Sequence, residues 1–336
     1  MDRPEKKIKN SAGENIPSVR TFPERFHSSK ANKTVPVQIN TDSILVFPEL
    51  EREYVILDPL NAGGNAVISI AEDKFLKRRV ALKSLRKELQ DDPVKKRAFI
   101  REAQIMAQLE HPGIVPVYGI AKDLTGGLHI IMKQIRGKSL KDLLKNLREK
   151  YAGNKLSRQK EKKLLIYRLE LYIRLCDAVA FAHSKNVLHG DLKPGNIMIE
   201  NNHDVYVMDW GNSEIVRKPH SECILKDTIS GTPSYLSPEA VRGECTDFRS
   251  EVFTLGLILF ETVTLSKAVA GKNSKEILTN LRDGKRNPIR HRYGMRISPV
   301  LRGIIKKAIH PEKEKRYQSV AIFAEELRNA LPNLFD

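Results

Sequence analysis

The sequence predicts an α+β fold, in which strands come before a larger helical part, and three segments carry this prediction. Residues 80–83 alternate as a strand does, residues 95–108 repeat apolar side chains at helical spacing (Ala98, Ile105, Leu109), and residues 252–264 form an apolar run of helical length. Because this last run is too short and too interrupted to cross a bilayer, we expect a buried helix there.

The length of 336 residues suits one large domain with an extensive core and leaves no room for a second enzyme. Residues 1–47 are rich in Lys, Ser, Asn and Pro, so we predict a disordered arm. Within it, the apolar residues 44–47 are a candidate docking strand. A targeting peptide is not expected, because acidic residues and no apolar stretch follow Met1.

The most informative segment is 189–196, His-Gly-Asp-Leu-Lys-Pro-Gly-Asn. Phosphoryl transfer from ATP needs a group that accepts the hydroxyl proton, a cation near the transferred phosphate and metal ions. Asp191, Lys193 and Asn196 fit these roles in this order, because an amide oxygen suits Mg²⁺. The spacing therefore predicts the catalytic loop of a phosphoryl transferase. A stiff surface turn is the alternative, which the neighbouring motifs disfavour.

A second metal ligand is expected thirteen positions after Asn196, where the chain reads Asp209-Trp210-Gly211. Residues 196–199 and 205–208 have the pattern of two short strands around a polar turn. Such a hairpin brings Asn196 and Asp209 to one edge, where both face the same pocket.

Together these motifs resemble a eukaryotic-type (Hanks-type) protein kinase over residues 54–331. The Asp-Trp-Gly tripeptide and residues 176–183 are similar to bacterial serine/threonine kinases of the chlamydial and planctomycete type. The resemblance implies a two-lobed fold: a small, mainly antiparallel β lobe with one key helix over 48–135, and a larger, mainly α-helical lobe over 136–336. It also implies ATP and Mg²⁺, or Mn²⁺, as cofactors and proteins with Ser/Thr acceptors as substrates.

The resemblance assigns further residues to nucleotide binding. It places Ala81 over the adenine and Lys83 toward the α- and β-phosphates, with Glu102 as the ion-pair partner of Lys83. Met132 resembles the residue at the back of the adenine pocket, and Met198 resembles the residue on its floor.

The loop that covers the phosphates departs from the family pattern G-x-G-x-x-G-x-V. The aligned nucleotide-binding residues are Leu60, Asn61, Gly63, Ala66 and Ile68. Asn61 tolerates the positive φ that a glycine usually adopts there. The methyl group of Ala66 is expected to hinder close approach to the phosphates and so to loosen nucleotide binding.

The catalytic loop also departs from the pattern. Gly190 replaces the arginine that receives an activation-loop phosphate, so we expect activity without phosphorylation of the loop. The candidate hydroxyls there are Ser213, Ser221, Thr228 and Ser230. Glu251 stands where the family has an aspartate that braces the catalytic loop, and its extra methylene is expected to weaken the brace.

These departures keep one alternative open, a nucleotide-binding pseudokinase that acts as a scaffold or regulator. Against it, every residue that a degenerate kinase tends to lose is present: Lys83, Glu102, Asp191, Lys193, Asn196 and Asp209. We therefore favour catalysis.

The large lobe carries further family features. Thr232 together with Lys193 indicates preference for serine and threonine over tyrosine. Glu239 and Arg316 are the family's buried ion pair. Met106, His189 and Trp210 are expected to stack between the helix glutamate and the metal aspartate.

The net charge of +17 invites a nucleic-acid hypothesis, especially at residues 145–163, which hold eight Lys/Arg against two Glu. No nucleic-acid module or series of stacking aromatics supports it. We expect a solvated surface or a site for an acidic partner instead. Cys176, Cys223 and Cys245 have no paired spacing, which suits a reducing cytoplasm and leaves open secretion into a host cell.

Overall fold

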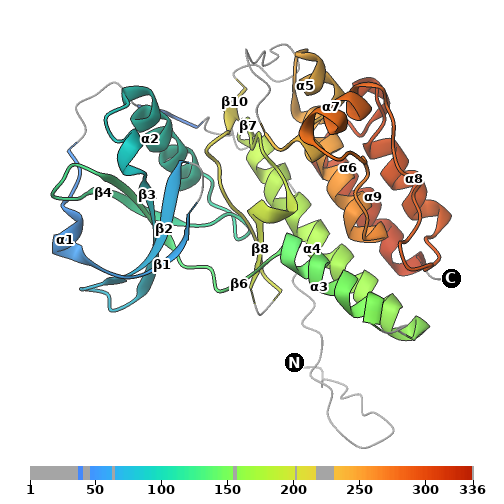
Figure 1. Cartoon of the computed structure of the whole chain (residues 1–336), viewed down its shortest axis with the longest axis horizontal. Coiled ribbons are helices and arrows are strands. Elements are labelled where there is room, and N and C mark those ends of the chain that lie inside the picture. The colour runs from blue at the N-terminus through green and yellow to red at the C-terminus, as the bar shows by residue number, and fades with distance from the viewer. Residues whose placement is uncertain are drawn as a thin grey trace, which may run out of the picture. The chain divides into compact units, whose positions relative to one another are not determined.

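The computed structural model describes residues 37–40, 46–62, 65–153, 157–200, 203–216 and 231–334. Figure 1 shows a small lobe built on a sheet, in blue to green, beside a mainly helical lobe, in green to red. This arrangement confirms the predicted α+β fold with two lobes.

The small lobe contains a five-stranded antiparallel sheet in the order β1-β2-β3-β5-β4. Its elements are α1 (Leu50–Glu53), β1 (Tyr54–Ala62), β2 (Ala66–Asp73), β3 (Arg79–Leu85), η1 (Lys87–Leu89), α2 (Pro93–Gln108), β4 (Val117–Lys122) and β5 (Leu128–Lys133). The central strand β3 buries Val80, Ala81 and Leu82 in succession, because both faces of the sheet are covered there.

Helix α2 is the key helix predicted for the small lobe. Asp92 caps it by accepting two backbone N–H groups of the first turn. Ile105 and Leu109 are buried as predicted, whereas Ala98 is exposed, so this part of the predicted apolar face is wrong. Phe99 is buried in its place, because the larger side chain next to Ala98 turns toward the sheet.

The large lobe is formed mainly by helices, with α6 at its centre (Figure 1). Its helical elements are α3 (Leu140–Gly153), α4 (Arg158–Ser184), η2 (Pro194–Asn196), η3 (Pro233–Tyr235), α5 (Pro238–Arg242), α6 (Phe248–Thr264), α7 (Ser274–Arg282), α8 (Pro299–Ala308), η4 (Lys313–Lys315), α9 (Val320–Ala330) and η5 (Leu331–Asn333).

Helix α6 confirms the buried helix predicted at 252–264. It begins four residues earlier than the apolar run, because Asp247 and Ser250 form a capping box at its start. Among the described residues, no helix combines the length and the apolar character that a membrane span requires.

Two small sheets lie at the junction of the lobes. One contains β6 (Gly137–Ser139), β8 (Ile197–Glu200) and β9 (Val205–Val207), and the other pairs β7 (Val187–Leu188) with β10 (Glu214–Ile215). The predicted hairpin is confirmed, because β8 and β9 are antiparallel with Ile197 opposite Val207. Its open end carries Asn196 and Asp209.

Part of the predicted disordered arm has a defined place. Residues 37–40 hydrogen-bond to α2 through Gln104 and Gln108, and the disorder of the rest of the arm stays a prediction. In the candidate docking strand, Val46 is exposed and Phe47 packs against the small-lobe core, whereas residues 44 and 45 lie outside the described residues.

The cysteines also differ from expectation. Cys176 is a buried free thiol, and its burial raises its pKa well above the ordinary value. Cys245 takes part in a disulfide, so the expectation of unpaired cysteines is wrong at this position. Cys223 lies outside the described residues.

The predicted ion pair between Glu239 and Arg316 is present and buried. The guanidinium donates to both carboxylate oxygens, with Nη1 2.7 Å from Oε1 and Nη2 2.8 Å from Oε2. Three backbone carbonyls accept the remaining N–H groups of Arg316, and Ser250 donates to Glu239. Every N–H group of the Arg316 guanidinium therefore has an acceptor, which offsets the cost of burying its charge.

We expect Arg316→Ala to lower the free energy of unfolding by about 3–5 kcal/mol, because it leaves a buried carboxylate without its partner. Chemical denaturation measures this. Arg328→Ala is the matched control, since Arg328 pairs with Asp177 on the surface and should cost less than about 1 kcal/mol. Equal losses in the two variants would contradict the expectation.

Candidate active site

Three charged side chains from different elements meet where α2 packs beside β3. The ammonium of Lys83 lies 2.5 Å from Oε1 of Glu102 and 3.1 Å from Oδ1 of Asp209. The side chains of Lys83 and Glu102 are only 14% and 5% exposed. The predicted ion pair is thus formed, and it extends to the predicted metal ligand.

Electrostatics favour the charged forms of Lys83 and Asp209, whereas burial raises the pKa of the Glu102 carboxyl. Burial disfavours the ammonium of Lys83, but Glu102 and Asp209 outweigh this effect, so the pKa of Lys83 is raised. Burial likewise disfavours the carboxylate of Asp209, but Lys83 outweighs it, so the pKa of Asp209 is lowered. Asp209 is therefore an anion at neutral pH, as a metal ligand must be.

The backbone at Asp209 is unusual, with φ at +63° in a residue that is not glycine. Such a conformation persists only where the surroundings hold it. Trp210 supplies the hold: it is fully buried, its indole N–H donates to the carbonyl of Val207, and its ring centroid lies 4.7 Å from that of His189. The predicted stack is confirmed for this pair, and Met106 is buried in the same core cluster as Trp210.

The side chain of Asp191 is oriented from both sides. Its Oδ1 accepts hydrogen bonds from the backbone N–H and the hydroxyl of Thr232, both at 2.9 Å. Lys193 contacts Oδ2. Asn196 donates through Nδ2 to the backbone carbonyl of Asp191 at 3.0 Å, which leaves its amide oxygen as the ligand atom for a hard cation.

His189 connects the catalytic loop with the segment that leads to Asp209. Its Nε2 lies 2.9 Å from the carbonyl of Met208, and its Nδ1 lies 3.2 Å from the backbone N of Asp191. Because a carbonyl can only accept and an N–H can only donate, Nε2 carries the proton and Nδ1 accepts. One imidazole thus joins the catalytic loop at Asp191 to the backbone of Met208, which precedes Asp209.

Glu251 braces the catalytic loop more firmly than the sequence suggests. Its Oε1 accepts the backbone N–H of Gly190 and its Oε2 accepts Nε2–H of His183, each at 2.7 Å. Burial raises the pKa of this carboxyl, but the hydrogen bond from His183 outweighs burial and the net pKa is lowered. The longer side chain thus reaches both the catalytic loop and α4.

The predicted adenine-side residues lie close together. Ala81 on β3 pairs across the sheet with Met132 on β5, and both are buried in one cluster against which Ile68 packs. Ile68 lies opposite Lys83 in the register of β2 and β3. Met198 lies on β8, opposite Ser139.

The loop over the phosphates is described only in part. The side chains of Leu60 and Asn61 and the whole of Gly63 lie outside the described residues. Ala66 begins β2, is 8% exposed and packs with Leu85 in the core of the small lobe. Its methyl group therefore points into that core, and the expected hindrance at the phosphates has no support.

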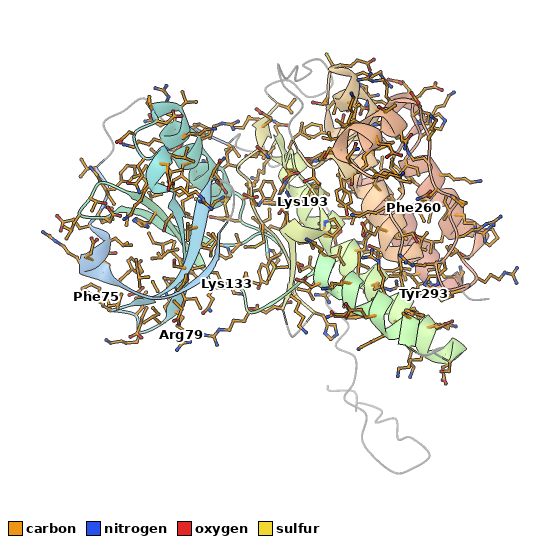
Figure 2. All side chains as sticks on the ribbon, in the orientation of Figure 1. Phe75, Arg79, Lys133, Lys193, Phe260 and Tyr293 are labelled. Atoms are coloured by element: carbon orange, nitrogen blue, oxygen red, sulfur yellow. The ribbon has the colours of Figure 1, made fainter. Side chains whose placement is uncertain are left out.

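Sequence reasoning missed Glu200 at the hinge. It accepts the backbone N–H of Arg136 at 2.9 Å and pairs with Lys133 at 3.3 Å, where the two lobes join. Figure 2 labels Lys133 at the edge of the small lobe nearest the large lobe, and Lys193 in the large lobe. Glu200 ends β8 and reads as part of a polar turn, so no sequence pattern distinguished it.

Arg101 on α2 was also missed, although it adjoins Glu102. It donates to the carbonyl of Ser213 at 2.7 Å and lies 3.6 Å from Glu214. Ser213 is buried, so its hydroxyl does not fit the predicted exposed phosphorylation site. The other candidates, Ser221, Thr228 and Ser230, lie outside the described residues.

A cavity of about 290 Å³ adjoins Asp191. Thr232, Leu236, Thr254 and Glu244 are among its lining residues. Neither Lys83 nor Asp209 contributes, so this space adjoins the carboxylate of Asp191 without being part of the charged cluster.

Comparison with known proteins gives one consistent result. The family model described as "Protein kinase domain" matches residues 54–328. The serine/threonine-protein kinase PknD of Chlamydia muridarum is 34% identical over 301 residues, which is 83% of this chain and 31% of that protein. PknD of Chlamydia trachomatis serovar L2b is 33% identical with the same coverage, and PknD of Chlamydia pneumoniae is 30% identical over 295 residues. The chain thus spans less than a third of the length of these curated relatives.

Gly190 is expected to tolerate no side chain. Its φ is +80°, and an added Cβ would lie 2.2 Å from the carbonyl oxygen of Asn212. We expect Gly190→Ala to destabilise the protein by about 1–3 kcal/mol, measured by denaturation. Gly195→Ala, in the same loop with open space around its Cβ, is the control and should be near neutral. A Gly190→Ala variant as stable as the control would refute this steric limit.

Proposed function

We propose that this chain, which belongs to the protein kinase family, transfers the γ-phosphoryl group of ATP to serine and threonine hydroxyls of protein substrates. The observation that carries the proposal is the cluster in which Lys83 bonds at once to Glu102 and to Asp209. Such an arrangement positions phosphates and a metal while Asp191 remains available for the acceptor. The names of the Chlamydia relatives support the choice of serine and threonine.

The residues present fit Mg²⁺. Asp209 is ionised and Asn196 presents an amide oxygen, which are the oxygen ligands that Mg²⁺ prefers. Within the described residues no three His, Cys, Asp or Glu side chains gather to hold a metal by themselves. A site with few protein ligands suits Mg²⁺, because phosphate oxygens complete its coordination. When bound, the metal neutralises charge on the transferring phosphate; Mn²⁺ is the alternative.

In the proposed reaction Asp191 accepts the proton of the acceptor hydroxyl as the new oxygen–phosphorus bond forms and the bond to the β-phosphate oxygen breaks. Thr232 holds Oδ1 through two hydrogen bonds, so Oδ2 is directed to the acceptor. Lys193 lies beside Oδ2 and places a positive charge where the transferred phosphate must pass. Lys83 holds the α- and β-phosphates.

The cavity beside Asp191 is the proposed place of the acceptor segment. It combines apolar lining from Leu236 with the hydroxyls of Thr232 and Thr254, so it suits a short side chain next to a polar group. We assign the adenine subsite to Ala81, Met132 and Met198. The loop around Gly63 is the proposed phosphate subsite.

The choice of partners is a further part of the proposal. An acidic partner at residues 145–163 stays a prediction, and part of the positive charge there is already paired, because Arg148 bonds to Glu261 at 2.5 Å.

We propose that the protein acts in the cytoplasm, where ATP is abundant. A reducing cytoplasm keeps cysteines as thiols, so the redox state of Cys245 in cells tests this location.

Asp191→Asn should reduce turnover by about 10²–10⁴-fold, because an amide cannot accept the hydroxyl proton. Transfer of labelled phosphate from Mg·ATP to a generic basic protein measures it, and ATP affinity should change little. Asp283→Asn, at an exposed aspartate of the large lobe, is the matched control. A wild type that binds ATP but transfers no phosphate with Mg²⁺ or Mn²⁺ would favour the pseudokinase alternative.

Activity should also survive removal of phosphate from the loop. Gly190 stands where the family's phosphate-receiving arginine would be, so dephosphorylation removes no contact that this position makes. Complete phosphatase treatment should leave turnover within about twofold of the untreated enzyme, while a phosphorylation-dependent kinase loses most of it. Mass spectrometry verifies that phosphate is gone. A large loss would mean that another basic residue receives a phosphate.

A further inference from the structure

Residues 37–40 lie along α2 and pair with it through the side chains of two glutamines. The amide of Gln108 accepts the backbone N–H of Gln38 at 2.8 Å and donates to the carbonyl of Gln38 at 2.7 Å. The amide of Gln104 makes the same two bonds with Asn40, at 2.9 and 2.7 Å. Each glutamine side chain therefore makes the two hydrogen bonds that a neighbouring strand would make in a sheet.

The spacing of these contacts explains why they form a ladder. In an extended chain, N–H and C=O of alternate residues point to the same side, about 6.6 Å apart. Residues four apart on a helix are separated by about 6 Å along its axis and lie on the same face. Gln104 and Gln108 therefore match residues 38 and 40 of an extended segment, and a single glutamine would not.

The other side of the segment is apolar. Val37 is 8% exposed and belongs to the largest core cluster, against which Ile39 also packs. Gln38 and Asn40 expose their side chains. The alternation of buried and exposed side chains shows that the segment is docked along its length rather than touching α2 at one point.

The docked face of α2 differs from the face that carries Glu102. Arg101, Gln104 and Gln108 follow the helical spacing of one face, whereas Glu102 lies on another. Arg101 binds the segment after Asp209 through Ser213. The docked face of α2 is thus held at two places, by residues 37–40 and by the Asp209 loop, while Glu102 reaches Lys83.

We propose that residues 37–40 are a clamp that positions α2 so that Glu102 stays within reach of Lys83. The clamp lies before residue 54, where the match to the kinase domain begins. Its catalytic consequence rests on the proposed function, but its effect on the position of α2 does not. Gln104 and Gln108 are therefore positioning residues, which act on phosphate binding through Glu102.

The sharpest test compares Gln38→Pro with Gln38→Ala in the full chain. Proline removes the N–H that Gln108 accepts, whereas alanine keeps it and removes only an exposed side chain. Gln108→Glu is a second disruptive variant, because a carboxylate cannot donate to the carbonyl of Gln38. Thermal unfolding establishes that all three variants fold.

The first readout is hydrogen exchange over residues 93–108. We expect exchange to rise roughly fivefold to tenfold in Gln38→Pro and Gln108→Glu and to stay at the wild-type rate in Gln38→Ala. Unchanged exchange in both disruptive variants would overturn the clamp. This readout needs no catalysis, so it decides the clamp even if the wild type transfers no phosphate, an outcome that would count against the proposed function alone.

The second readout separates positioning from simple coverage of the helix. Gln38→Pro should reduce kcat roughly fivefold to tenfold in the wild-type background and should add no further loss to Glu102→Gln, because the clamp acts through that carboxylate. In a chain without turnover, ATP affinity replaces kcat with the same expected pattern. Equal values for Gln38→Pro and Gln38→Ala, or independent losses in the Glu102→Gln background, would overturn the proposal.

Discussion

The structure depends above all on one buried ammonium, that of Lys83, and on the two carboxylates that neutralise it. A charge withdrawn from water is tolerated only when partners reach it with good geometry. Those partners come from α2 and from the segment after β9, which are far apart in sequence. The placement of α2 and the hairpin of β8 and β9 therefore serve a single electrostatic requirement at the junction of the lobes.

The catalytic loop meets a second constraint, which concerns its backbone rather than its charges. Gly190 adopts a left-handed conformation directly against the carbonyl of Asn212, and its N–H is held by Glu251. The same carboxylate also holds His183, so the longer side chain at 251 connects the loop to α4. Two departures from the family pattern thus meet in one contact.

The position of α2 depends on contacts on more than one face of the helix. One face carries Glu102, which bonds to Lys83. Another face carries Arg101, Gln104 and Gln108. The large lobe, by contrast, is held by the buried α6 and by the fork between Glu239 and Arg316.

The sequence by itself determined a candidate site and the elements that carry it. Asp191, Lys193, Asn196 and Asp209 could be proposed as site residues because phosphoryl transfer requires these side-chain types at fixed offsets, and the hairpin and α6 followed from local periodicity. Even the distant pair of Glu239 and Arg316 could be carried over, because its motif accompanies the others.

Only the tertiary structure decided where several side chains point and what they contact. The methyl of Ala66 packs into the small-lobe core, Glu251 reaches two partners, and residues 37–40 dock on α2 although their composition predicted disorder. The reason is physical: the contacts of Gly190 and of residues 38 and 40 join partners 61 to 70 positions apart through backbone groups, which every residue possesses, so no local pattern marks them.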